Sequence, residues 1–219
     1  MTPRIALIHA LKHSIAPIED AFARLWPAAR LANLLDDSLS ADLARDGALT
    51  PAMTERFLTL ARYARASGAD GILFTCSAFG PCIEACAHEL APMPVLKPNE
   101  AMIDDAVELV GPRGCVGLLA TFAPTLDSMP PEFASVAPGV TVVPRLAEGA
   151  LAALDRGDAA AHDRAAVDAA MALRSCEVIA LGQFSLARAA RAIGAATGQR
   201  VLTTPDSAVI KLQRLLGGR

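Results

Sequence analysis

Short, uninterrupted apolar runs recur along the chain, separated by longer segments in which apolar residues return every three or four positions. A run without alternation is typical of a strand covered on both faces, whereas the longer period predicts an amphipathic helix. The predicted strands are residues 4–8, 31–35, 71–74, 93–96, 115–120, 140–143, 178–181 and 201–202. Because such strands alternate with helices, we predict an α/β fold with parallel sheets and right-handed crossovers.

Several of the predicted helices begin at recognisable caps. Thr50–Pro51 and Thr204–Pro205 each place a capping threonine before a proline, which suits the first helical turn because its missing N–H would have no partner there. Residues 158–173 form a strongly helical, alanine-rich segment. Residues 36–47 are mainly polar and are predicted to form a loop.

The order of elements repeats in two halves of the chain. Corresponding positions lie 107 to 111 residues apart, and the pairs are Ile5 and Val116, Leu31 and Val140, Cys76 and Gln183. We therefore predict two pseudo-symmetric, flavodoxin-like parallel-sheet domains that face each other across a cleft. The first would span residues 1–97, completed by a C-terminal helix at 205–219, and the second residues 98–204. A single larger sheet without internal symmetry is the alternative.

Composition limits the classes of function. Hydrophobic residues fill 53% of the 219 positions and charged residues 20%, so the chain can bury a large core. A net charge of −3 without a basic block, together with only 4% aromatic residues, argues against nucleic acid as a partner. No apolar run approaches the roughly 20 residues of a membrane span, and no secretory signal pattern opens the chain. We expect a soluble, cytoplasmic protein that does not bind membranes.

The five cysteines do not form the pattern of a disulfide framework, because their number is odd and they are scattered. Cys82 and Cys86 share a face of a predicted helix, but two further zinc ligands are missing nearby, so we predict no metal site. Cys115 and Cys176 lie within or beside predicted strands and are expected to be core thiols.

Cys76 is the cysteine with the most suggestive position. The apolar run 71–74 ends at Thr75, and a helix is predicted to begin near Pro81, which puts Cys76 at a strand-to-helix turn. The amide N–H groups of a helix N-terminus favour a thiolate, so we expect the pKa of Cys76 to be lowered. Residues 178–185 repeat the plan, with Gln183 at the corresponding turn.

Polar residues gather at the predicted strand ends, where parallel sheets bind ligands. They supply hydroxyls, one amide, one thiol and backbone N–H groups, a set that binds a small carboxylate through uncharged donors. The candidates are His9, Ser14, Thr75, Cys76, Ser77, Thr121, Thr125, Gly182 and Gln183. Phe79, Phe122 and Phe184 would decide whether an aliphatic or an aryl acid fits. His9 either touches substrate or is an ordinary loop residue. His88 and His162 lie on the faces of predicted helices, and we expect both to face solvent.

The segments 74–80, 120–121 and 181–182 resemble the aspartate/glutamate racemase superfamily, which includes hydantoin racemases, maleate isomerases and arylmalonate decarboxylases. The resemblance implies two pseudo-symmetric α/β domains, a pocket between them, no cofactor and assembly into a homodimer or higher homo-oligomer. It also implies two cysteines that flank the substrate α-carbon, one removing a proton while the other donates one. Cys76 matches the first of these.

Gln183 departs from the second, and an amide cannot exchange a proton at neutral pH. We therefore expect a cofactor-independent isomerase of this family that performs one-thiol chemistry alpha to the carboxylate of a small acid, with Ser77 and Thr121 holding the enediolate. The alternatives are a decarboxylase of a malonate-like acid and a catalytically silent carboxylate-binding protein. A hydrolase with Cys76 and His9 as nucleophile and base is a further possibility.

Overall fold

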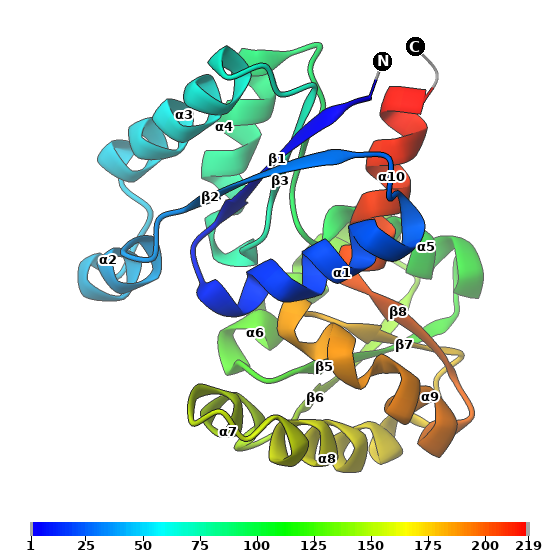
Figure 1. The fold of residues 1–219 in the computed structure, drawn as a ribbon. Helices are drawn as coiled ribbons and strands as arrows, with labels where there is room; N and C mark the ends of the chain where they lie inside the picture. The colour runs from blue at the N-terminus through cyan, green and yellow to red at the C-terminus, as the bar shows by residue number, and fades with distance from the viewer. Residues whose placement is uncertain (1, 218–219) are drawn as a thin grey trace. The chain divides into compact units, whose positions relative to one another are not determined.

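The protein is described by a computed structural model that covers residues 2–217, and the chain divides into two compact units. Unit 1 runs to Pro98 and resumes at Ala208, and unit 2 comprises Asn99–Ser207. Each unit contains a four-stranded parallel sheet, with strand order β2-β1-β3-β4 in unit 1 and β6-β5-β7-β8 in unit 2 (Figure 1). The predicted parallel α/β architecture is thereby confirmed, and the alternative of one larger sheet is wrong.

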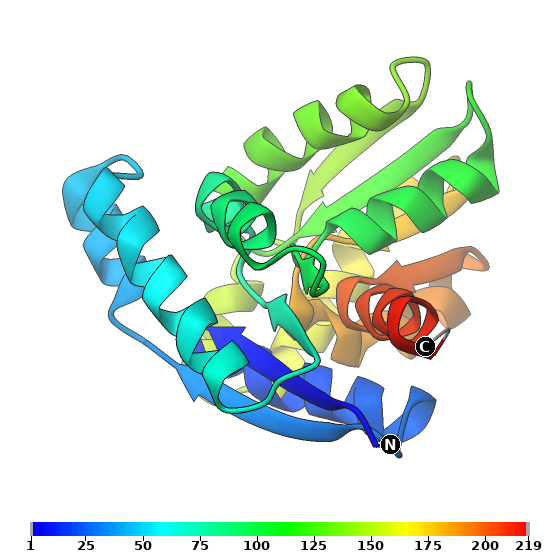
Figure 2. The same ribbon diagram turned by 90° about the horizontal axis from the view of Figure 1, so that it is seen from above.

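In unit 1, the four apolar segments predicted as strands form the sheet. The strands are β1 (Arg4–His9), β2 (Arg30–Leu35), β3 (Gly71–Phe74) and β4 (Val95–Leu96). The helices are α1 (Ile15–Leu25), α2 (Leu39–Asp46), α3 (Pro51–Ala66), α4 (Gly80–Leu90) and most of α10 (Thr204–Gly217), which begins in unit 2. The described residues of unit 1 also form two short 3-10 turns, η1 (Lys12–Ser14) and η2 (Ser77–Phe79). Helices α3 and α4 pack against each other, and β1 and β2 run side by side (Figure 2).

In unit 2 the same plan recurs, with two helices again connecting the second and third strands. The strands are β5 (Cys115–Ala120), β6 (Thr141–Leu146), β7 (Val178–Leu181) and β8 (Arg200–Thr203). The helices are α5 (Glu100–Val110), α6 (Ala123–Val136), α7 (Ala150–Asp155), α8 (Ala159–Ala170) and α9 (Ala190–Thr197), with 3-10 segments η3 (Met171–Leu173) and η4 (Phe184–Ala189).

The two central strands of each sheet explain the uninterrupted apolar runs. All four residues of β3 and of β7 are buried, as are five of the six residues in β1 and in β5. Strands β2, β6 and β8 are edge strands that contain exposed and half-buried positions, so the expectation that every strand is covered on both faces is wrong for these three. An edge strand has a neighbour on one side only and fewer helices above and below it.

Two local predictions need correction. Residues 36–47 do not form a loop throughout, because α2 occupies Leu39–Asp46 and ends at Gly47, whose φ of 70° closes the helix in the left-handed region. The alanine-rich segment 158–173 is divided between α8 and the 3-10 turn η3. Among the described helices, none is both long enough and apolar enough to span a membrane.

Candidate active site

Cys76 lies between the carboxyl end of β3 and the 3-10 turn η2, as the sequence predicted. Its backbone is extended, with φ −129° and ψ 121°, and α4 begins four residues later at Gly80 with Pro81 in the first turn. Thr75 immediately before it is buried, whereas Cys76 is only half-buried. The thiol is therefore held by a rigid strand end and still faces solvent in part.

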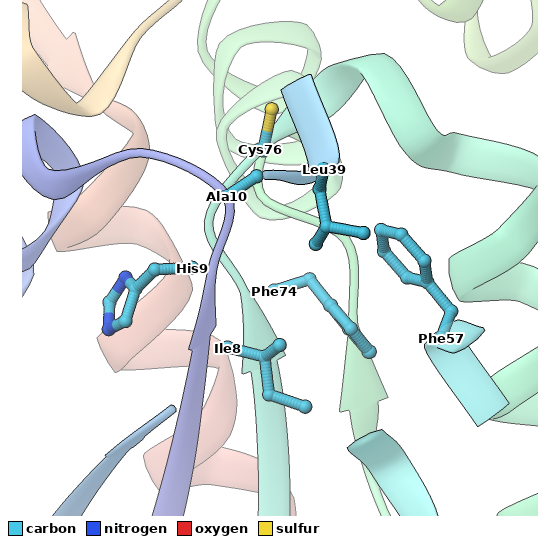
Figure 3. A pocket seen from close by; sticks show the side chains of 7 residues that line it. All are labelled: Ile8, His9, Ala10, Leu39, Phe57, Phe74 and Cys76. Carbon is cyan, nitrogen blue, oxygen red and sulfur yellow. The ribbon is translucent and has the colours of Figure 1, made fainter. Parts of the chain in front are cut away.

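A packed aromatic wall supports this turn. The ring of Phe57 on α3 lies 5.2 Å from that of Phe74, which ends β3, and 4.8 Å from that of Phe79 in η2, measured between ring centroids. Ile8 and Leu39 complete the apolar side of a small hollow next to Cys76 (Figure 3). The hollow has no room for a water molecule, so it is part of the packed core of unit 1.

The thiol of Cys76 points away from that apolar wall, as Figure 3 shows. Burial raises the pKa of Cys76 above its ordinary value, and a hydrogen bond with the Ala78 backbone opposes this shift only in part. The expectation that the helix start lowers this pKa is therefore wrong. A 3-10 turn of three residues separates Cys76 from α4, so one backbone hydrogen bond has to offset the desolvation of the thiolate. The raised pKa favours the protonated thiol of Cys76 over the thiolate.

His9 ends β1 and belongs to a chain of four polar side chains. Nδ1 of His9 lies 2.9 Å from Oγ1 of Thr75, and Nε2 lies 2.9 Å from Oδ1 of Asn33. Asn33 in turn donates from Nδ2 to Oε1 of Glu19 at 2.7 Å. The hydrogen bond to Glu19 leaves Oδ1 of Asn33 facing the His9 ring. An amide oxygen only accepts, so Nε2 of His9 carries the proton and Nδ1 accepts from the Thr75 hydroxyl.

These contacts change the role expected for His9. Its side chain is completely buried and both ring nitrogens have partners, so it is not placed to touch a substrate. Burial lowers the pKa of His9, against the opposing effects of the Asn33 hydrogen bond and the Glu19 charge, which keeps the ring neutral. In Figure 3 the ring lies on the opposite side of β1 from Ile8 and points away from Cys76. The nucleophile-base pair of the hydrolase hypothesis is absent.

Thr75 is the residue that links His9 to the cysteine. Its backbone N–H donates to the carbonyl of Ile8 at 3.0 Å, and its own carbonyl accepts from the hydroxyl of Ser14, 3.5 Å away. Ser14 and Thr75 are both buried, so they hold the strand end in place. Ser77 is half-buried, and its hydroxyl bonds to none of the described residues.

Gln183 occupies the corresponding turn of unit 2, after β7. Its Oε1 accepts hydrogen bonds from both the backbone N–H of Thr121, at 2.5 Å, and the Thr121 hydroxyl, at 2.9 Å. A backbone N–H can only donate, so the amide must present its oxygen to Thr121 and its NH₂ group elsewhere. The two hydrogen bonds from Thr121 therefore fix the orientation of the Gln183 side-chain amide.

The other residues of unit 2 that were predicted to belong to the site differ in how exposed they are. Thr125 and Phe184 are buried, whereas the Phe122 side chain is 47% exposed. A Cβ added at Gly182 would lie 3.0 Å from Sδ of Met129 and 3.2 Å from Cγ2 of Thr125, so the turn packs directly on α6. Gly182 thus has a packing role, and it brings Thr125 to the same turn as Gln183.

Two members of the His9 chain were not singled out from the sequence. Asn33 lies in the middle of an apolar run, and this break in the pattern was a signal that could have identified it. Glu19 lies on α1 and resembles any solvent-facing helix residue in sequence. His88 is exposed as the sequence predicted, but His162, also expected to face solvent, is completely buried on the inner face of α8.

The described residues contain no group of three or more side chains arranged to hold a metal ion. Cys82 and Cys86 are both buried in the core of unit 1, and burial raises the pKa of Cys86 to about 12. Cys176 is also buried, as predicted, whereas Cys115 is only half-buried.

These features define an α/β protein that carries its polar groups at the carboxyl ends of parallel strands, with a cysteine at one strand-to-helix turn. The pattern of the Asp/Glu/Hydantoin racemase family matches residues 16–212, and the chain belongs to this family. The resemblance noted in the sequence is therefore confirmed.

Solved structures show the same fold at low sequence identity. A glutamate racemase from Bacillus anthracis is 12% identical, with a TM-score of 0.72 over 99% of this chain and 82% of its own. An allantoin racemase from Klebsiella pneumoniae is 20% identical, with a TM-score of 0.73 over 99% and 88%. Unliganded arylmalonate decarboxylase is 19% identical, with a TM-score of 0.65 over 100% and 94%. No curated protein matches the chain in sequence.

The buried His9 predicts a pH-dependent stability. In the unfolded chain His9 takes up a proton near pH 6.5, whereas in the folded protein its lowered pKa resists protonation. Unfolding therefore binds a proton between these two pKa values, and its free energy falls as the pH drops below about 6.5. We expect His9→Gln to lessen this fall, as measured by urea denaturation at a series of pH values.

His88→Gln is the matched control, because His88 is exposed on α4. It should leave the acid-side slope of the wild type unchanged. Equal slopes for the wild type and His9→Gln would contradict the assignment of a buried neutral imidazole.

Proposed function

We propose that the protein is a cofactor-independent enzyme of the racemase family that acts alpha to the carboxylate of a small acid, with Cys76 as its essential thiol. The observation that carries this proposal is the position of Cys76, half-buried at the end of β3 and held by the network of Thr75, His9 and Ser14. A preorganised turn of this kind suits proton transfer, which depends on accurate placement of the donor.

The raised pKa of Cys76 favours proton delivery over nucleophilic attack. A thiol with a raised pKa is a poor nucleophile, but it can give its proton to a carbanion formed next to a carboxylate. Loss of carbon dioxide from a malonate-like acid generates such a carbanion without a base. For this reason a decarboxylase is the second candidate function, beside an isomerase in which Cys76 must first lose its proton.

Gln183 is proposed to bind the substrate rather than to transfer protons. Its NH₂ group is directed away from Thr121, and an N–H donor there suits a carboxylate or enediolate oxygen. We propose further donors or contacts from Ser77, Thr121 and Gly182. The side chains of Phe122, Thr125 and Phe184 are proposed to shape the binding surface, whereas His9, Ser14 and Thr75 position the cysteine turn.

A catalytically silent carboxylate-binding protein is favoured by one observation only, the amide at Gln183 in place of a second thiol. Assembly as a homodimer and a cytoplasmic location stay predictions from the sequence and the family resemblance.

The test is turnover in heavy water with malonates, maleate, amino acids and hydantoins as substrates. We expect one class to be converted, with one deuterium at the α-carbon of the product and a single product enantiomer, because one thiol delivers the proton to one face. A racemic product in which both enantiomers carry deuterium at the α-carbon would contradict one-thiol chemistry. A compound that stabilises the protein without being converted, in a panel where nothing is consumed, would support the binding protein instead.

A further inference from the structure

Two cysteines of unit 2 touch each other at the amino-terminal edge of its sheet. Cys115 is the first residue of β5, and Cys176 lies two residues before the start of β7 at Val178. The two strands are hydrogen-bonded neighbours, with Val116 paired to Val178, so their beginnings lie together. The Sγ atoms are 2.7 Å apart, so the two free thiols are in direct contact.

The backbone holds this contact in place. Between the two cysteines, the N–H of Glu177 donates to the carbonyl of Cys115 at 3.1 Å, and the Glu177 carboxylate accepts from the N–H of Cys115. The N–H of Cys176 donates to the carbonyl of Leu173 at 3.0 Å. The thiols cannot separate widely without breaking these bonds. The effective concentration of one thiol at the other is therefore high.

The two thiols differ in exposure. Cys115 is half-buried, whereas Cys176 is only 1% exposed. Burial, the Cys115 hydrogen bond and nearby negative charge raise the pKa of Cys176 to about 12. Cys176 is therefore shielded from reagents in solution, and the sulfur of Cys115 is its accessible partner.

We propose that Cys115 and Cys176 form a modification site, at which exchange with a small disulfide such as oxidised glutathione closes a reversible disulfide between β5 and β7. Cys115 loses its proton to solvent, and its thiolate attacks glutathione disulfide, giving a mixed disulfide and one glutathione thiolate. Cys176 then attacks the sulfur of Cys115, and its proton leaves with the second glutathione. Both cysteines are oxidised and one glutathione disulfide is reduced to two glutathiones.

The cross-link stabilises the fold without reaching the candidate site. It joins residues 61 apart in sequence and so restricts the unfolded chain. Thr121 and Gln183 follow the opposite ends of the same two strands. This proposal does not depend on the proposed reaction, since it concerns two thiols that the reaction does not use.

The experiment equilibrates the protein with oxidised and reduced glutathione and identifies disulfides by peptide mass spectrometry. We expect a cross-linked peptide pair containing Cys115 and Cys176, a rise in Tm of about 5–15 °C, and reversal by dithiothreitol. Cys176→Ser should instead trap glutathione on Cys115, because the second thiol is missing. Cys115→Ser should abolish both products at this site.

Cys82→Ser/Cys86→Ser is the matched control, since it removes the other cysteine pair and should leave the cross-link intact. A wild-type protein that retains glutathione on Cys115, or that keeps both thiols free under oxidising conditions, would overturn the proposal. The Tm of the reduced variants shows whether each is folded before oxidation.

Discussion

Cys76→Ala is expected to lower turnover by about 10²–10⁴-fold, the range in which a positioned proton donor contributes to catalysis. The side chain is half-buried and lies at a turn, so removing its sulfur leaves no large cavity in the aromatic wall beneath it. The loss should appear in kcat, because the proton moves in the transition state while substrate binding uses other groups. The measurement is steady-state kinetics on whichever acid the wild type converts.

Cys115→Ser provides the matched control under reducing conditions. Cys115 is another half-buried cysteine, but it begins β5 and so lies at the amino-terminal edge of its sheet. Its replacement should leave kcat within about twofold of the wild type. Full turnover by Cys76→Ala would remove the thiol from the mechanism and with it the proposed function.

Phe57→Ala is expected to lower the free energy of unfolding by about 3–5 kcal/mol, the cost of removing a large buried ring. Phe57 is 2% exposed and contacts two rings, those of Phe74 and Phe79, which lie on either side of the Cys76 turn. The resulting cavity cannot fill easily because Phe74 is fixed in β3 and Phe79 in η2. Urea denaturation monitored by circular dichroism measures the change.

Tyr63→Ala tests whether the destabilisation by Phe57→Ala comes from the loss of a buried ring or from any substitution of an aromatic residue on α3. Tyr63 lies on the same helix with 61% of its side chain exposed, so its loss should change the free energy of unfolding by less than about 0.5 kcal/mol. Similar destabilisation by both variants would mean that Phe57 is not part of a rigid core. If Phe57→Ala remains folded, it should also lower turnover by loosening the Cys76 turn.

Particular elements show why the sequence predicted some features and missed others. The run 71–74 identified β3, because a central strand buried on both faces has no polar positions. Helix α2 was missed because contacts from outside the helix help to hold it: Arg56 on α3 forms ion pairs with Asp42 of α2 and with Asp36, which precedes the helix. Such contacts between distant residues leave no local pattern.

In the candidate site, too, the sequence predicted some features and missed others. The turn position of Cys76 followed from the end of an apolar run and the proline beyond it, both local features. The direction of its pKa shift was wrong, because it depends on how much water the folded chain removes from the thiol. Likewise, His162 was expected to face solvent, yet it shares the buried face of α8 with Ala166 and Ala170.

The sequence by itself determined the alternation of strands and helices, the duplicated order and the placement of Cys76 and Gln183 at equivalent turns, because periodicity and capping act within a few residues. Only the tertiary structure decided that His9 is a buried neutral ring behind Thr75, that Gln183 accepts a hydrogen bond from Thr121, and that Cys115 touches Cys176. Those outcomes depend on burial and on hydrogen-bond partners 61 to 66 residues away, which the chain acquires only when its strands assemble.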